Sequence, residues 1–241
     1  MIPKIIHYCW FGRKDIPDRL QKCIKSWEKH LTDYKFICWN EDDFDINSTI
    51  WTKEAYQAKK YAFVSDYVRL LALEKYGGIY LDTDVFLKQP LDSFLHYKAF
   101  TGFEKENAIT SAVIGCEPHF PLIQEFLSFY DGKHFLGEDG SLNNEANVVM
   151  MTNILLKYGL QLDDTEQSIE EMRIFPCAYF CPLDFYHNDH STEQTVAIHY
   201  FDASWLDEDT KKMIEKERTP WHKAIVKVMG KFKSFAMNSQ R

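Results

Sequence analysis

A helix stop, a short apolar strand and two aspartates form the stretch that most constrains this chain. Gly77 and Gly78 end an apolar helix, Ile79–Leu81 reads as a buried strand, and Asp82 and Asp84 follow it. Side chains two apart in an extended chain point the same way, so we expect both carboxylates at one sheet edge. Adjacent carboxylates repel unless a cation or proton lies between them, and such oxygen pairs suit magnesium or manganese. The stretch therefore predicts a metal site able to hold a diphosphate; the alternative is a solvated turn.

The beginning of the chain predicts an α/β fold. An apolar strand over residues 2–12, a helix over 18–30 and a second strand over 34–39 make a strand–helix–strand unit, typical of a parallel sheet. The unit lacks the G-x-G-x-x-G loop that binds phosphate, which leaves a metal as the obvious means of holding one. The 241 residues, 45% of them hydrophobic, are enough for one sizeable α/β domain.

The remaining chain alternates between helical and strand patterns. We expect helices over residues 53–59, 62–76, 121–130 and 145–158, a turn with a short helix over 90–94, and strands over 99–103, 108–115, 174–180 and 195–200. Residues 137–144 read as a polar loop, which could line a substrate pocket or simply connect two elements.

Two charged side chains stand out in the otherwise apolar helix over residues 62–76. Asp66 and Arg69 are three residues apart and therefore share one face of the helix. Unpaired charges in a buried helix are costly, so the two residues either pair with each other or face a polar site. Their spacing leaves both a structural ion pair and a functional pair open.

His199 lies near the end of the strand expected over residues 195–200. A single histidine on a strand is usually structural. An imidazole at a strand end could instead reach a metal that Asp82 and Asp84 already hold. The spacing leaves both interpretations open.

Composition argues against two broad classes of protein. The net charge is −8 and no basic stripe runs through the body of the chain, which argues against nucleic-acid binding. No run of eighteen apolar residues occurs, so we expect no membrane span. The six cysteines are scattered without zinc-finger spacing and no secretory signal is recognised, so we expect free thiols in a cytoplasmic protein.

The last residues differ from the body of the chain. Over residues 221–241 lysines are interleaved with apolar side chains, which predicts a basic amphipathic helix. Such a helix could dock on the core, or it could make a peripheral contact with anionic lipid on the inner face of the plasma membrane.

Several segments taken together resemble one enzyme family. They are residues 2–7 with Trp10, residues 65–69, residues 76–84, and His199 with Ser204 and Trp205. This order of motifs is similar to that of the DXD-containing sugar-binding glycosyltransferases of family 32, which include yeast initiating mannosyltransferases and bacterial capsule enzymes. The glucosyltransferase domains of large clostridial toxins show the same order. The resemblance covers the chain from its first residues to about Trp205.

The resemblance implies a fold, an activity and partners. The fold would be a single Rossmann-like GT-A domain over residues 1–210, with a mostly parallel central sheet, followed by a C-terminal helical tail over 211–241. The activity would be that of a metal-dependent, retaining hexosyltransferase that uses a nucleotide-sugar donor, with a UDP-sugar favoured. The acceptor would be a glycan or lipid-linked glycan, in bacterial cell-surface or capsular polysaccharide synthesis.

The resemblance also implies roles for individual residues in donor binding. Trp10 would stack on the donor base, Tyr80 would lie beside the donor, and Asp66 with Arg69 would contact the donor sugar. Ser204 and Trp205 would contact the diphosphate. The full expected donor-binding set is Trp10, Asp66, Arg69, Tyr80, Asp82, Ser204 and Trp205.

The expected metal ligands are Asp82, Asp84 and His199, for Mn²⁺ or Mg²⁺, and the expected catalytic residues are Asp66, Arg69, Asp82 and Asp84. A divalent ion stabilises the charge that builds on a leaving diphosphate. No enzymic nucleophile is recognised, so the acceptor hydroxyl is expected to attack on the same face of the sugar, as the family does.

Two classes of alternative to a glycosyltransferase remain: a metal-dependent phosphatase or nucleotidyltransferase, and a non-enzymatic binding protein. A phosphatase of the haloacid-dehalogenase type needs Asp-x-Asp-x-Thr, but Phe86 occupies the fifth position. A nucleotidyltransferase needs a glycine-rich loop near the first strand, where Gly12 stands without further glycines beside it. A non-enzymatic nucleotide-sugar-binding protein would keep the same residues but lack turnover.

Overall fold

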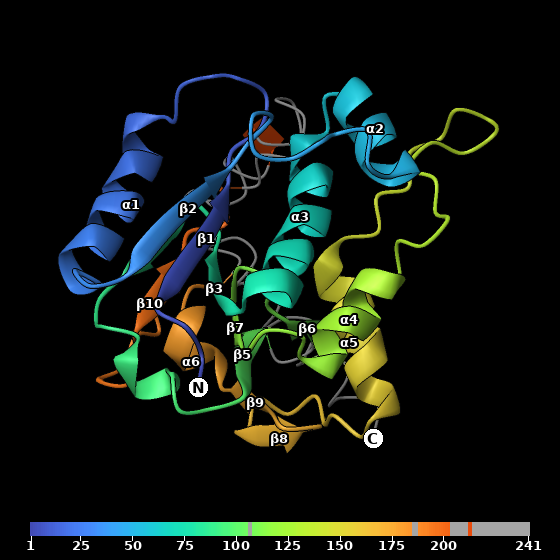
Figure 1. Cartoon of the computed structure of the whole chain (residues 1–241). Coiled ribbons are helices and arrows are strands. Elements are labelled where there is room, and N and C mark those ends of the chain that lie inside the picture. Colours follow the sequence, from blue (N-terminus) through green and yellow to red (C-terminus); the bar gives the residue numbers. More distant parts are fainter. Residues whose placement is uncertain (106–107, 185–187, 203–211, 214–241) are drawn as a thin grey trace, which may run out of the picture.

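A computed structural model describes residues 1–105, 108–184, 188–202 and 212–213 (Figure 1). In this described part the main sheet has eight strands, in the order β2-β1-β3-β7-β5-β9-β8 with β6 paired to β5, and β10 pairs with β4 in a second, two-stranded sheet. The strands are β1 (Ile5–Cys9), β2 (Lys35–Trp39), β3 (Gly78–Leu81), β4 (Val85–Leu87), β5 (Ala99–Lys105), β6 (Ala108–Ile109), β7 (Val113–Cys116), β8 (Gln167–Ile169), β9 (Met172–Phe175) and β10 (Ala197–His199). The helices are α1 (Asp18–His30), α2 (Ile50–Gln57), α3 (Tyr61–Tyr76), α4 (Pro121–Ser128), α5 (Asn147–Lys157) and α6 (Cys177–Phe180), with a 3₁₀ turn η1 (Asp92–Phe94).

The main sheet is mixed. β1 pairs in parallel with both β2 and β3, as the strand–helix–strand unit at the start of the chain predicted, and β5 pairs in parallel with β9. β7 runs antiparallel to β3 and β5, and β8 runs antiparallel to β9. The predicted α/β class, with helices around one central sheet, is confirmed.

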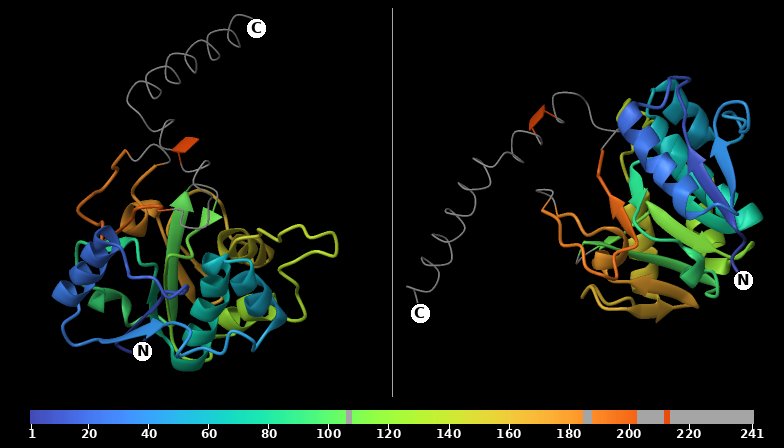
Figure 2. Two further views of the ribbon diagram at one scale, coloured as in Figure 1. Left: turned by 90° about the horizontal axis from the view of Figure 1, so that it is seen from above. Right: turned by 90° about the vertical axis from the view of Figure 1, so that its left-hand side faces the viewer.

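Helices cover both faces of this sheet, which Figure 2 shows from two further directions. α3 packs on one face, with α2, α4 and α5 beyond it, and the core there includes Trp51, Val68 and Phe126. α1 and α6 lie on the other side, with a core that includes Trp27 and Phe180. Because both faces are covered, central strands such as β3 are apolar along their whole length.

Glycines allow the sharp turn from α3 into β3. Gly77, the C-cap of α3, has φ +58, and a Cβ there would lie 2.6 Å from the backbone nitrogen of Pro118. Gly78 has φ +98, and its Cβ would lie 2.6 Å from the carbonyl oxygen of Ile5. The left-handed backbone and the close approach of neighbouring chain leave room for glycine alone. The predicted helix stop is therefore confirmed.

The structure also corrects some expected elements. Residues 177–180, predicted as strand, form α6, because Pro176 precedes the helix and Asp164 Oδ1 accepts a hydrogen bond from the Cys177 N–H at 2.6 Å. The strand predicted over 108–115 is divided into β6 and β7. The sequence pattern also missed β4 and β8, which are three residues each. Short strands of this kind depend on a partner that a local pattern does not reveal.

The expected C-terminal tail over residues 211–241, apart from Lys212 and Met213, lies outside the described residues, as does the proposed domain boundary at 210. Within the described part of the chain, the helices are too short or too polar to cross a lipid bilayer.

Candidate active site

Asp82 and Asp84 lie on a tight turn that joins β3 to β4. The N–H of Val85 donates to the carbonyl of Asp82 at 3.0 Å, which closes the turn, and the N–H of Asp82 donates to the carbonyl of Ala112 at 2.9 Å. The two carboxylates therefore come together through a reverse turn and not, as expected, through alternation along an extended strand. The prediction of paired carboxylates at the sheet edge is correct, but the reason given for it is wrong.

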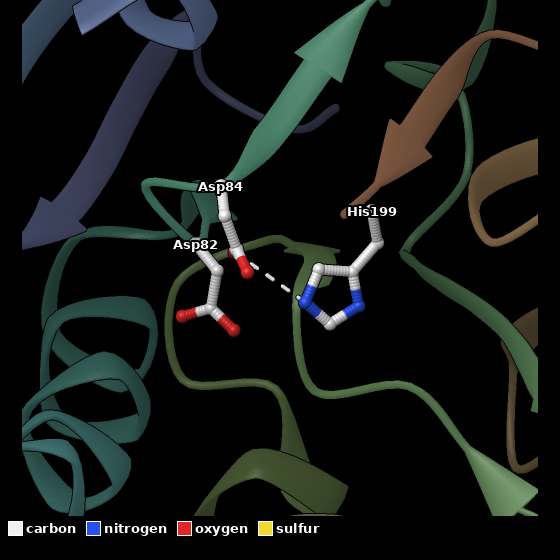
Figure 3. A group of neighbouring side chains, drawn as sticks. All are labelled: Asp82, Asp84 and His199. Carbon is white, nitrogen blue, oxygen red and sulfur yellow. Dashed lines mark ion pairs between the residues drawn. The ribbon is translucent and has the colours of Figure 1, made fainter. Parts of the chain in front are cut away.

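His199 reaches the same place from the far end of the chain. β10 pairs antiparallel with β4, and His199 lies opposite Val85 in that register. One ligand atom from each of Asp82, Asp84 and His199 lies within 4.8 Å of the others, and Figure 3 shows the three side chains gathered around one space. His199 Nε2 is 3.4 Å from Asp84 Oδ1. The structure thus brings together the three side chains expected to bind the metal.

Asp84 and His199 form a buried charged pair. Burial by itself would raise the pKa of Asp84, but the positive charge of His199 and the hydrogen bond to it keep that pKa below its ordinary value. Burial would likewise lower the pKa of His199, while the charge of Asp84 raises it well above the ordinary value. Both residues are less than one tenth exposed, so each stabilises the charge of the other.

Arg69 ties the central helix to this turn. Its Nη2 lies 2.8 Å from Asp66 Oδ1 and 3.3 Å from Asp82 Oδ1, while Nη1 lies 3.3 Å from Asp82 Oδ2. Nη1 also donates to the carbonyl and the hydroxyl of Ser111, at 2.7 and 3.0 Å. Asp66 and Arg69 therefore pair with each other, and the pair also borders the two-aspartate turn.

Asp66 is held in a dry environment. Burial raises its pKa to about 6, against the opposing effect of the Arg69 charge. Its backbone carbonyl accepts a hydrogen bond from Asn147 Nδ2 at 2.8 Å, and Asn147 Oδ1 accepts one from the Tyr130 hydroxyl at 2.5 Å. The sequence pattern did not predict Ser111 or Asn147 as site residues. The run of small residues before Gly115, which contains Ser111, was the one available signal.

Tyr80 and Trp10 occupy different positions around the turn. The buried Tyr80 hydroxyl donates to Asp82 Oδ1 at 2.8 Å, and the guanidinium carbon of Arg69 lies 4.6 Å from the centre of the Tyr80 ring. Trp10 follows β1 at the same sheet edge, three residues beyond His7, which pairs with Tyr80. The Trp10 indole donates to the carbonyl of Lys14 at 2.5 Å. The expected diphosphate contacts, Ser204 and Trp205, lie outside the described residues.

Part of this chain is similar to a known glycosyltransferase family and to curated fungal proteins. Residues 17–101 match the family described as "Glycosyltransferase sugar-binding region containing DXD motif". The chain is 33% identical over 126 residues to inositol phosphoceramide mannosyltransferase 3 of Schizosaccharomyces pombe, covering 51% of this chain and 35% of that protein. It is 30% identical over 135 residues to mannosyl phosphorylinositol ceramide synthase SUR1 of Saccharomyces cerevisiae, covering 53% and 34%. The matched region thus spans about a third of these relatives.

Solved structures similar to this chain include two glycosyltransferases. The PaToxG glycosyltransferase matches with a TM-score of 0.48 at 18% identity, over 65% of this chain and 68% of that one. The galactosyltransferase LgtC, solved with donor and acceptor sugar analogues, matches with a TM-score of 0.48 at 12% identity, over 88% and 93%.

Proposed function

We propose that this chain transfers a hexose from a nucleotide sugar to an acceptor hydroxyl, because residues 17–101 match the sugar-binding region of the DXD-containing glycosyltransferases, in agreement with the resemblance found in its sequence. The observation that carries the proposal is the meeting of Asp82, Asp84 and His199, with Arg69 and Asp66 immediately beside them. This arrangement combines a group of metal-binding side chains with a fixed cation and a carboxylate able to accept hydrogen bonds from sugar hydroxyls.

The three candidate ligands fit a divalent ion. Two carboxylates and an imidazole offer oxygen and nitrogen donors, and their ligand atoms are close enough to share one ion. A nitrogen donor suits Mn²⁺ better than Mg²⁺, which favours oxygen ligands and keeps much of its water. When bound, such an ion stabilises as a Lewis acid the negative charge that builds on a leaving diphosphate.

The protein residues would divide the remaining work. The planar guanidinium of Arg69, fixed by Asp66, Asp82 and Ser111, would place its positive charge beside the donor sugar and diphosphate. Asp66 would accept hydrogen bonds from the sugar, and Tyr80 orients Asp82 through its hydroxyl. We include retention of the anomeric configuration in the proposal: the acceptor hydroxyl attacks on the face from which the diphosphate leaves and gives its proton to that phosphate.

Donor and acceptor are proposed by class. A UDP-sugar is the donor that the sequence favoured, and GDP-mannose is the second candidate because relatives of this chain are named mannosyltransferases. The acceptor is proposed to be a glycan or a lipid-linked glycan, with a role in cell-surface polysaccharide. A cytoplasmic location with peripheral membrane contact through residues 211–241 also stays a prediction.

The test is a donor screen. UDP-glucose, UDP-galactose and GDP-mannose are each incubated with the protein and Mn²⁺ without acceptor, and the products are separated by chromatography. Slow release of free sugar with the nucleoside diphosphate supports the proposal, provided that the Asp84→Asn variant lacks it. Release of inorganic phosphate would instead indicate a phosphatase. Binding without release from any donor, even after glycan acceptors are added, would indicate a binding protein.

A further inference from the structure

The segment that follows β10 folds back onto Asp84. The N–H of Tyr200 donates to the Asp84 carbonyl at 3.1 Å, and the N–H of Asp202 donates to Asp84 Oδ2 at 2.8 Å. His199 Nε2 faces the other carboxylate oxygen, Oδ1, at 3.4 Å. The position of residues 199–202 therefore sets the orientation of the Asp84 carboxylate, and with it the spacing of two candidate metal ligands.

The backbone of this segment is strained and must be held in place. Phe201 has φ +52, a left-handed conformation that a bulky side chain rarely adopts. Such a conformation is energetically unfavourable and persists where surrounding contacts fix it. The Phe201 ring packs against His199, with ring centres 4.2 Å apart. A contact that fixes the segment would thus act directly on the ligand geometry.

Arg19 makes such a contact. In the first turn of α1, its Nη1 pairs with Asp202 Oδ1 and its Nη2 donates to Asp202 Oδ2, so both carboxylate oxygens are engaged by one planar fork. The Asp202 side chain is 13% exposed, whereas the Arg19 side chain is 65% exposed. The pair connects two residues that lie 183 positions apart in the chain.

α1 is a firm support for this contact. The Trp27 indole donates to the carbonyl of Val85 at 2.6 Å, and the Ser26 hydroxyl accepts from the N–H of Leu87 at 2.9 Å. Both bonds fasten α1 to β4, the strand that leaves the two-aspartate turn. The chain from α1 through β4, Asp84 and Asp202 back to Arg19 is therefore a closed ring of contacts.

We infer that Arg19 is a positioning residue for the metal site: by fixing Asp202, it holds the Asp202 N–H against Asp84 and keeps Asp84 and His199 at a spacing that one ion can bridge. This inference rests on the proposed function. An ordinary exposed ion pair contributes little to stability. The Arg19 pair differs because its partner's backbone binds a candidate ligand.

The test measures Mn²⁺ affinity by the electron paramagnetic resonance signal of free Mn²⁺, without donor or acceptor. Arg19→Met keeps the length of the side chain and removes its charge, and Arg19→Lys keeps the charge and removes the fork. The matched control is Arg173→Met, since Arg173 pairs with Glu166 at 2.7 Å on β9, away from the turn. Melting temperatures are recorded for every variant.

Partners that orient metal ligands typically change affinity about 10- to 100-fold when they are lost. We expect Arg19→Met to weaken Mn²⁺ binding about 10-fold with little change in melting temperature, Arg19→Lys to lie between it and the wild type, and Arg173→Met to match the wild type. Asp202→Asn should weaken binding similarly, and the double variant Arg19→Met/Asp202→Asn should be no worse than either single change.

The outcomes separate this inference from the proposed function. Wild-type protein that binds no Mn²⁺ overturns the metal site and the role of Arg19 with it. Wild-type binding that Arg19→Met leaves unchanged, or that Arg173→Met weakens as much, overturns the role of Arg19 alone. If Arg19→Met melts at a much lower temperature than the wild type, the Arg19→Lys variant is used in its place. An Arg19→Lys variant that binds Mn²⁺ as tightly as the wild type then overturns the inference.

Discussion

The guanidinium of Arg69 pairs with both carboxylate oxygens of Asp82, with Nη1 3.3 Å from Oδ2 and Nη2 3.3 Å from Oδ1. The same Nη2 lies 2.8 Å from Asp66, and the Arg69 side chain is only 5% exposed. One buried cation is thus shared between a carboxylate of α3 and the first carboxylate of the two-aspartate turn. Asp82 is therefore partly neutralised and oriented by the protein itself.

Removing that cation should destabilise the fold. Arg69→Met leaves Asp66 and Asp82 without their shared partner, and breaking a buried pair from one side costs about 3–5 kcal/mol. We expect a loss of that size in the free energy of unfolding, measured by denaturation in urea. Arg173→Met, which breaks the more exposed pair with Glu166, should cost about 1 kcal/mol or less. Equal stability of the two variants would contradict the shared-cation description.

The Tyr80 hydroxyl should matter more for activity than for stability. Tyr80→Phe keeps the ring beside Arg69 and removes the hydrogen bond to Asp82 Oδ1. We expect a loss of about 1 kcal/mol in unfolding free energy and about a 10-fold lower transfer rate, because Asp82 loses one of the groups that orient it. The measurements are urea denaturation and release of nucleoside diphosphate.

Tyr34→Phe provides the matched control for that change. The Tyr34 hydroxyl is buried and has no hydrogen-bond partner among the described residues. Its removal should leave both stability and transfer rate unchanged, or raise stability slightly, because an unpaired buried hydroxyl is lost. If both phenylalanine variants behave alike, the bond from Tyr80 to Asp82 has no functional role.

Local sequence patterns predicted the elements that local interactions form. The helix expected over residues 18–30 has those bounds in the structure, and α3 begins one residue before its expected start. The glycine pair marked the end of α3 because the left-handed backbone there excludes other residues. The group of Asp82, Asp84 and His199 followed from residue type and from a family resemblance.

Contacts between distant segments could not be predicted in this way. Ser111 binds Arg69 because β7 lies next to β3, and Asp202 binds Arg19 because β10 lies next to β4. Neither pairing has a local signature. Asp164, which caps α6, likewise lies 13 residues before the helix it starts, which is why residues 177–180 were mistaken for a strand.

Metal binding should stabilise the folded protein. A ligand that binds only the native state adds about 2.7 kcal/mol of stability at 100 times its dissociation constant. We expect Mn²⁺ to raise the melting temperature of the wild type, EDTA to reverse the rise, and Asp84→Asn to abolish it. Asp92→Asn, at an exposed aspartate that pairs with Lys4, should retain the full rise. A rise that survives in Asp84→Asn would place the ion elsewhere.

His7 should make stability depend on pH below neutrality. It is fully buried on β1; its Nε2 lies 2.9 Å from the Gly77 carbonyl, and its Nδ1 accepts from the Trp39 indole at 3.1 Å. These contacts require a neutral ring, and burial lowers the pKa of His7 from 6.5 to about 4. Between pH 4 and pH 6.5 the unfolded state binds a proton that the folded state does not. The contribution of the neutral His7 ring to stability is therefore complete above pH 6.5 and is lost as the pH falls toward 4.

The expected contribution of His7 is about 3 kcal/mol, from a pKa difference of about 2.5. It is measured as the difference in unfolding free energy between pH 7 and pH 4.5, in the wild type and in His7→Gln. The comparison between variants is needed because Asp66, whose pKa burial raises to about 6, acts with the opposite sign in this range. His7→Gln should be less stable at pH 7 and lose less stability on acidification, whereas His96→Gln, at an exposed histidine, should follow the wild type. Parallel pH profiles for the wild type and His7→Gln would show that His7 is not held neutral by these contacts.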